Sequence, residues 1–210
     1  MLTDKEYLLL CEIVSRGILN ENEVGIGEAV RLLISKDNCN YRELLEEVLS
    51  SSNLVELRLK DSKIFEGIKV FVFRDLSEND LIVFAGDERF EGFDNQYIDE
   101  IIDFVKRNIK MENLCITGLE KGGIYAAYIA SCIGAKAVVF GAPCLEDLSG
   151  DITNFVAENE PVGQYIENVV FVKQKIIDEI DDKAYFDILM FDDRGKAVEG
   201  EQTEYYKFCS

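Results

Sequence analysis

The 210-residue sequence contains no histidine and only two prolines. Its six cysteines include no C-x-x-C pair, so the sequence lacks both kinds of ligand spacing that are typical of a structural zinc site. No Gly/Ser-rich, repetitive or low-complexity stretch separates one part of the chain from another. We therefore expect a single domain over residues 1–210, with no metal ion and no cofactor.

Long apolar runs are also absent. No run approaches the roughly 20 residues that a membrane-spanning helix needs. The first residues, MLTDKEYLLLCEIVSRG, place acids before the apolar stretch and offer no small-residue cleavage site, unlike a signal peptide. Most cysteines fall inside apolar patterns, where a reduced thiol behaves as a small buried hydrophobe. These features favour a cytoplasmic protein.

Charge of one sign dominates what is present. Acidic residues number 41 and basic residues 22, for a net charge of −19. Such a surface repels phosphate backbones and anionic lipid headgroups, which argues against nucleic acid and bare membrane as partners. It favours a protein partner with a basic surface, or it serves solubility alone. The charge does not determine the oligomeric state.

Three helices are predicted within residues 1–50, and we expect this segment to pack on a sheet. Thr3 and Glu6 form a T-x-x-E capping box at the start of the first helix. The second is predicted over 24–35 and the third after Asn40, both from apolar residues at helical spacing.

Strands and helices alternate in the rest of the chain. Strands are predicted at 54–59, 64–73, 81–84, 114–117, 137–140, 169–172 and 185–191, and helices at 95–109 and 124–133. Strand, glycine-rich turn, helix and strand over 114–140 form a βαβ unit, which makes its two strands parallel. Strands that read as continuous apolar runs are buried on both faces. The prediction is an α/β fold: a three-layer α/β sandwich around a mostly parallel sheet.

The turn at 118–123 reads GLEKGG and lies where a buried strand enters a buried helix. Gly118, Glu120 and Gly122 occupy the first, third and fifth positions of a G-x-E-x-G pattern, with Glu120 where the nucleophile elbow G-x-S-x-G has its serine. Two glycines around such a turn also occur for packing alone. The pattern gains meaning only from its neighbours.

Residues 118–130, GLEKGGIYAAYIA, resemble the elbow GHSKGGNLAxYAA of a little-characterised bacterial branch of the lipase-like α/β-hydrolase-fold family. Upstream, FAGDERFEGFDN (84–95) is similar to the family's FRGTD strand end and following G-W-x-x-D. Downstream, FGAP and ENEPVG resemble the family's A-P turn and its N-x-N-D-P-V acid loop. The resemblance implies a sandwich of the α/β-hydrolase type. The former elbow and pocket positions that it implies are Gly86, Asp87, Gly118, Glu120, Lys121, Gly122 and Glu160.

The chain departs from this family where the chemistry lies. Glu120 replaces the serine, and no histidine exists anywhere to act as the base, although the family places one near 199–203. Asp87 falls where the family supplies an oxyanion N–H, and a carboxylate there opposes the charge that develops in the transition state. We therefore expect no catalytic residue of the family's kind and predict a pseudoenzyme that acts as a binding or regulatory protein.

The alternative is a hydrolase with altered, carboxylate-based chemistry at Glu120, assisted by Lys121, Asp87 and Glu160. The same three carboxylates could instead hold a hard cation such as Mg²⁺ or Ca²⁺, or they could be solvated surface.

A redox role is the third hypothesis. It rests on Cys115, Cys132 and Cys144, of which Cys115 and Cys144 are expected near the former site. Buried structural thiols are the competing interpretation.

Overall fold

The computed structural model describes residues 2–19, 25–35, 41–86, 95–110, 112–143, 148–159, 169–175 and 185–201. These ranges form a seven-stranded sheet whose strands lie side by side in chain order. The strands are β1 (Arg58–Phe65), β2 (Ile68–Arg74), β3 (Asp80–Gly86), β4 (Cys115–Leu119), β5 (Lys136–Phe140), β6 (Ile152–Ala157) and β7 (Val169–Val172). The helices are α1 (Asp4–Ser15), α2 (Ile26–Ile34), α3 (Arg42–Ser50), α4 (Ser52–Val55), α5 (Ile98–Asn108, preceded by the 3₁₀ turn η1, Asn95–Tyr97), α6 (Lys121–Ile133) and α7 (Tyr185–Ile188).

The sheet changes character at β3. The first three strands form an antiparallel meander, whereas β3 to β7 pair in parallel. Parallel neighbours need a crossover connection, and α5 and α6 supply the crossovers from β3 to β4 and from β4 to β5. The predicted βαβ unit and the mostly parallel sheet are therefore confirmed.

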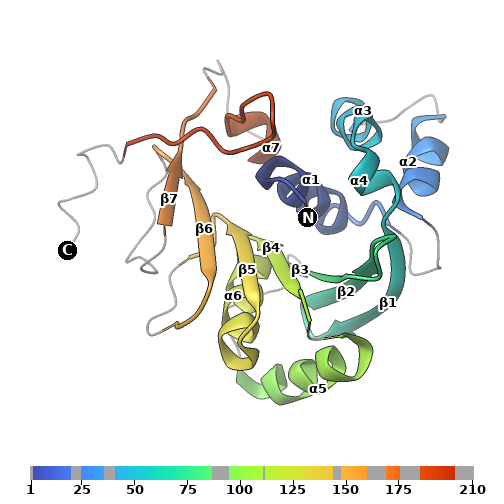
Figure 1. Ribbon diagram of the computed structural model, residues 1–210, viewed down its shortest axis with the longest axis vertical. Helices are drawn as coiled ribbons and strands as arrows, with labels where there is room; N and C mark the ends of the chain where they lie inside the picture. The colour runs from blue at the N-terminus through green and yellow to red at the C-terminus, as the bar shows by residue number, and fades with distance from the viewer. Residues whose placement is uncertain are drawn as a thin grey trace.

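The sheet lies between two layers of helices (Figure 1). Helices α5 and α6 cover one face, because successive right-handed crossovers in one direction place their helices on the same side. Helices α1 and α7 cover the other face, with α2, α3 and α4 beside α1. Alternate strand residues enter one apolar core or the other. Burial on both faces accounts for the continuous apolar runs in the sequence.

The predicted capping box at the start of α1 is present. The N–H of Glu6 donates to Thr3 Oγ1 at 3.3 Å, and the N–H of Thr3 donates to Glu6 Oε2 at 2.8 Å. Glu6 Oε1 also accepts from the Ser51 hydroxyl at 2.6 Å. The cap therefore both starts α1 and ties it to the residue before α4.

Two of the predicted strands have different boundaries in the structure. The run 64–73 is divided by a turn at Glu66–Gly67, so it supplies the end of β1 and all of β2. Gly67 has φ +83°, which glycine adopts without steric cost. The run 54–59 is wrong as a strand, because Ser51 caps the short helix α4 by accepting from the N–H of Leu54, and β1 begins only at Arg58.

The predicted strand 185–191 is also wrong: its first four residues form α7. Tyr185 and Phe186 are buried against the α1 layer, and the N–H of Phe186 donates to Glu12 Oε1 at 3.2 Å. Tertiary contacts therefore override the strand preference of these aromatic residues. Strand β6 had no counterpart in the sequence prediction.

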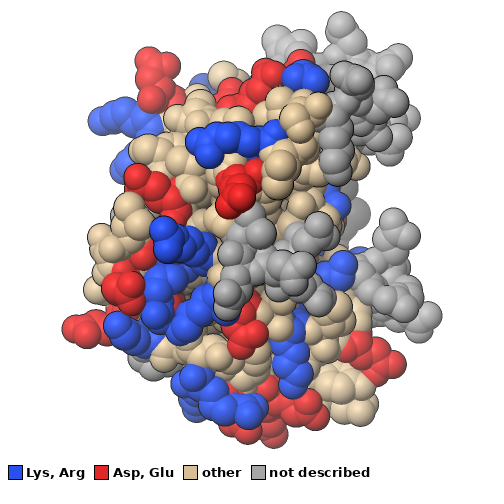
Figure 2. All heavy atoms as spheres, turned by 90° about the vertical axis from the view of Figure 1, so that its right-hand side faces the viewer, with Lys and Arg blue, Asp and Glu red and all other residues tan. Residues whose placement is uncertain are grey.

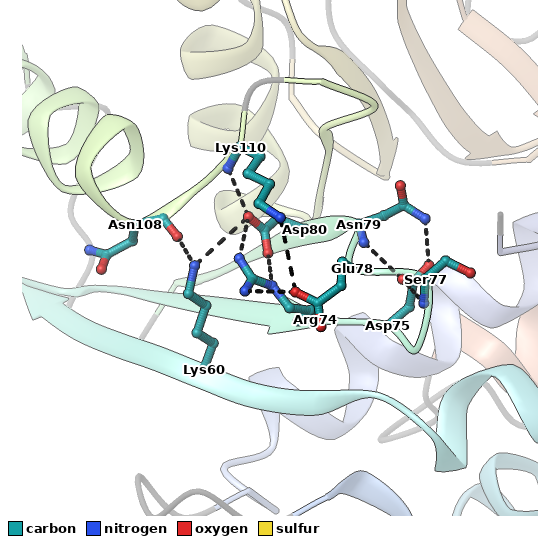
Figure 3. Close-up of polar contacts among 9 residues, drawn as sticks. All are labelled: Lys60, Arg74, Asp75, Ser77, Glu78, Asn79, Asp80, Asn108 and Lys110. Atoms are coloured by element: carbon teal, nitrogen blue, oxygen red, sulfur yellow. Dashed lines mark hydrogen bonds and ion pairs between the residues drawn. The ribbon is translucent and has the colours of Figure 1, made fainter.

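A buried carboxylate joins the β2–β3 hairpin to the connection that follows α5. The Asp80 side chain is 0% exposed and accepts from Arg74 Nε at 2.7 Å and Nη2 at 3.1 Å (Figure 3). The backbone N–H of Lys110 donates to the same carboxylate at 2.8 Å. Burial acts to raise the pKa of Asp80, but the Arg74 and Lys110 hydrogen bonds and the nearby Lys60 charge hold it below its ordinary value. The charge is buried without being left unpaired, as a stable fold requires.

Charge is not evenly spread over the surface. Figure 2 looks onto the side where β1 and β2 lie in Figure 1, and Lys and Arg side chains gather there. Residues 58–74 contain five bases and two acids, against the large acidic excess of the whole chain. Across the described ranges, no helix combines the length and apolar character needed to cross a membrane.

Candidate functional site

The backbone is strained at the turn from β4 into α6, within the predicted site. Glu120, the residue between the two elements, has φ 48° and ψ −115°. A side-chain-bearing residue in such a sparsely populated conformation costs of order 1–3 kcal/mol and persists only when its surroundings enforce it. The N–H of Glu120 donates to Phe140 O at 2.8 Å, and its carbonyl accepts from the N–H of Ile124 at 3.2 Å. Strand β5 and the first turn of α6 therefore hold the bend from both sides.

The glycines of the turn are required by close packing. A Cβ on Gly122 would lie 2.3 Å from Phe84 O, and a Cβ on Gly118 would lie 2.5 Å from Gly122 O. A Cβ on Gly86 would lie 2.8 Å from Lys121 Cβ. The start of α6 thus rests directly on the ends of β3 and β4. This packing brings together five of the seven predicted positions: Gly86, Gly118, Glu120, Lys121 and Gly122.

The Glu120 side chain is exposed and does not cap α6. It stands at the carboxyl end of β4, ahead of a helix N-terminus, where backbone N–H groups and the helix dipole favour negative charge. The neighbouring Lys121 is half-buried. This arrangement can present one carboxylate on a rigid turn. The carboxylate can accept a hydrogen bond from a partner molecule or pair with a cationic group on it.

The other two predicted positions, Asp87 and Glu160, lie outside the described residues. Their meeting with Glu120 stays a prediction, and so does a cation site built from the three carboxylates. Among the residues that the structure describes, no three His, Cys, Asp or Glu side chains come together as a metal site would need.

Two residues beside the turn were missed by the sequence analysis. Tyr185 covers Gly141, since a Cβ there would lie 2.5 Å from the Tyr185 hydroxyl oxygen. Asn154 on β6 is buried and clamps the next residue, Ala142: its Nδ2 donates to Ala142 O at 2.8 Å, and its Oδ1 accepts from Ala142 N at 3.2 Å. Both act one or two residues after Phe140, the acceptor of the Glu120 N–H. A polar residue inside the apolar stretch 152–157 was the signal for Asn154, whereas Tyr185 offered none.

The expectation that Cys115 lies near the predicted site at Glu120 is wrong. Cys115 is the first residue of β4 and Glu120 follows its last, so roughly 16 Å of extended chain separates them. Burial raises the pKa of the Cys11 thiol to about 12 and also raises the pKa of Cys115. Raised thiol pKa values disfavour the reactive thiolate. Cys132 is exposed on α6, and Cys144 lies outside the described residues.

Comparison with known proteins adds no assignment: no family model matches the chain, and no curated protein matches it. What this site can do is therefore inferred from its own residues.

Proposed function

We propose that this protein is a pseudoenzyme with a lipase-like α/β-hydrolase framework, acting as a binding or regulatory protein that presents Glu120 at its former elbow. One observation carries the proposal: a glutamate is held in a strained strand-to-helix turn, exposed, in a chain without histidine. The strained turn is the backbone feature of a nucleophile elbow. The groups that would make it catalytic are missing.

Acyl transfer needs a base that accepts the nucleophile's proton and later activates water. Histidine serves because its ordinary pKa lies near neutrality, and no histidine is present. A carboxylate nucleophile at Glu120 would form an acyl-enzyme that still required such a base for release. Binding through Glu120 has no such requirement.

The backbone strain at Glu120 supports a functional role for the glutamate side chain. Glycine would fit this backbone conformation without steric cost. The Glu120 carboxylate does not cap α6 and is not buried. The side chain therefore adds no stabilising contact to the turn that would offset the backbone strain. Backbone strain of this kind clusters at functional sites.

Charge indicates the kind of partner. A net charge of −19 favours association with a basic protein surface. Because the bases of β1 and β2 gather on one side (Figure 2), such a partner would meet another part of the molecule. The carboxyl end of β4 presents an exposed Glu120 on a rigid turn and is available for such a contact.

The first test is chemical. Purified protein and the Glu120→Ser variant should show no saturable cleavage of simple acyl esters, because the serine would still lack a base. Saturable cleavage by the natural protein that Glu120→Gln abolishes would overturn the proposal and establish the carboxylate-based hydrolase instead.

The second test concerns binding. A partner captured from the source cell should bind more weakly as salt rises, and the charge reversal Glu120→Lys should abolish the interaction. The matched control is Glu112→Lys, an exposed glutamate before the start of β4 at the other edge of the sheet. Equal loss with both variants would mean that only net charge matters and that Glu120 has no specific role.

A further inference from the structure

A groove of about 620 Å³ opens at the amino ends of β3, β4 and β5, the edge of the sheet opposite Glu120. Buried residues form its inner wall: Tyr7, Leu57, Leu81, Leu114 and Cys115. The volume falls in the range of small-molecule sites, roughly 300–1,000 Å³, and such sites are mostly apolar with a few placed polar groups. The groove has the size and the lining of a ligand site.

One rim of the groove is a rigid turn that holds out a leucine. Leu76 lines the groove and is 64% exposed. The Asp75 carboxylate fixes the turn by accepting from Ser77 N at 2.8 Å, Asn79 N at 2.8 Å and Asn79 Nδ2 at 2.9 Å (Figure 3). The adjoining Arg74–Asp80 pair anchors the turn to the sheet. Because the turn is already ordered, a ligand that contacts this exposed leucine does not have to order the loop, and little conformational entropy is lost on binding.

The groove also contains a lysine that makes no ion pair among the residues that the structure describes. Lys136, the first residue of β5, lines it beside Cys115, its partner in the parallel register. Paired residues of neighbouring strands lie on the same face of the sheet, so the Lys136 side chain starts beside Cys115, and the charges of Lys136 and Asp151 act on the Cys115 thiol in opposite senses. In the described part of the chain no carboxylate lies within ion-pair distance of Lys136.

The acids on the groove are mostly engaged elsewhere. Asp75 accepts N–H donors within its turn, and Asp80 is paired with Arg74. Glu56 lines the groove but is exposed on the surface. The groove therefore combines an apolar inner wall with one lysine that makes no ion pair among the described residues, in a protein whose net charge is −19.

We propose that this groove binds a small monocarboxylate with an apolar body, the carboxylate pairing with Lys136 and the body lying along Leu76, Leu81 and Leu114. The site is separate from the elbow, so it goes beyond the proposed function and does not depend on it.

Octanoate is a suitable probe, compared with octan-1-ol and octylammonium, which carry the same chain with a neutral and a cationic head. Leucine methyl shifts in NMR titrations report both affinity and place. We expect octanoate to bind more tightly than either analogue and to shift the methyls of Leu76, Leu81 and Leu114. The Glu120→Gln variant should titrate as the natural protein does, which keeps this test independent of the elbow.

Lys136→Met removes the ammonium with little change in length, and it should weaken octanoate about fivefold, as loss of one partly exposed ion pair does, while leaving octan-1-ol unchanged. Lys69→Met is the matched control and should change neither, because Lys69 is a half-buried lysine on β2 that makes no ion pair among the described residues. Leu76→Ser should weaken both ligands. Equal affinities for the three probes, an equal response of the two lysine variants, or no groove shift at about 5 mM octanoate would overturn the proposal.

Discussion

At the scale of the residue, Glu120 adopts a backbone conformation that is costly for a residue with a side chain. Its φ of 48° places Cβ in a crowded position, and the surrounding bonds to Phe140 and Ile124 enforce it. The packing of Gly118 and Gly122 leaves no space for the turn to relax. The packing of the whole turn therefore causes the backbone strain, which is located at Glu120.

We expect Glu120→Gly to unfold at a higher urea midpoint than Glu120→Ala, by about 1 kcal/mol in unfolding free energy. Glycine relieves the backbone strain at position 120, whereas alanine keeps the Cβ that causes it. The greater conformational entropy of glycine in the unfolded chain offsets only part of this gain in folded-state stability. The alanine variant serves as the control, because both changes remove the carboxylate. A glycine variant less stable than the alanine variant would show that the turn is unstrained.

At the scale of the element, Asp80 ties the β2–β3 hairpin to the segment after α5. Without the Asp80 charge, the hydrogen bonds that Arg74 and the Lys110 N–H donate to this side chain become weaker. Hydrogen bonds to a buried charged group contribute about 1.5–3 kcal/mol each. The end of the hairpin, with the rim of the groove, depends on this contact.

Asp80→Asn should lower the unfolding free energy by about 2 kcal/mol at pH 7. The pKa of Asp80 is held below its ordinary value of 3.8, so its stabilisation is complete above that pH and is lost as pH falls through the lowered value. The difference between natural protein and variant should therefore be constant above about pH 5 and shrink below 3.8. Urea unfolding across pH measures it, and a difference that widened in acid would contradict the assignment.

Glu12 should show the opposite slope. Burial raises its pKa above the ordinary 4.5, despite Arg16 and the N–H of Phe186, so its ionised form is disfavoured in the folded state. Relative to Glu12→Gln, the natural protein should lose stability as pH rises from 4.5 through the raised value. Equal pH profiles for the two proteins would mean that Glu12 is solvated and that α7 is not docked over it.

At the scale of the molecule, the acidic excess opposes compactness. With 41 acids against 22 bases, like charges repel over the folded surface more than over an expanded chain. The described ion pairs are mostly surface contacts such as Lys5–Glu47 and Arg42–Glu46, and pairs of that kind contribute little. Net repulsion should outweigh them.

Raising NaCl from low to moderate ionic strength should therefore stabilise the fold by ~1 kcal/mol, or about 2–4 °C in Tm at this chain length. Thermal unfolding in NaCl and in KCl should give the same increase, which separates screening from ion-specific effects. A Tm that falls with salt would indicate that attractive pairs dominate.

Local pattern was sufficient where a segment's own residues decide its structure. The Thr3–Glu6 cap, the βαβ unit and the bend at Glu120 follow from spacing, propensity and glycine placement within a few neighbouring positions. The turn at Glu66–Gly67 has a local signal in its glycine, but the β-branched and aromatic residues on both sides make the run 64–73 resemble one strand. Gly118, Glu120, Lys121 and Gly122 share that local character, whereas Gly86 meets them only because β3 packs against the start of α6.

Contacts between distant segments decided the rest. Residues 185–188 form a helix that packs on α1, where the N–H of Phe186 donates to Glu12, a residue far away in the sequence. Cys115 and Glu120 lie at opposite ends of β4, so the whole length of that strand separates them. The groove joins Tyr7, Leu76, Cys115 and Lys136 from four parts of the chain. Composition and periodicity thus determined the layered architecture and the absence of histidine as a proton-transfer base, since both are properties of residue types. Only the tertiary structure decided which side chains meet across the sheet, since burial and pairing depend on segments that the sequence holds apart.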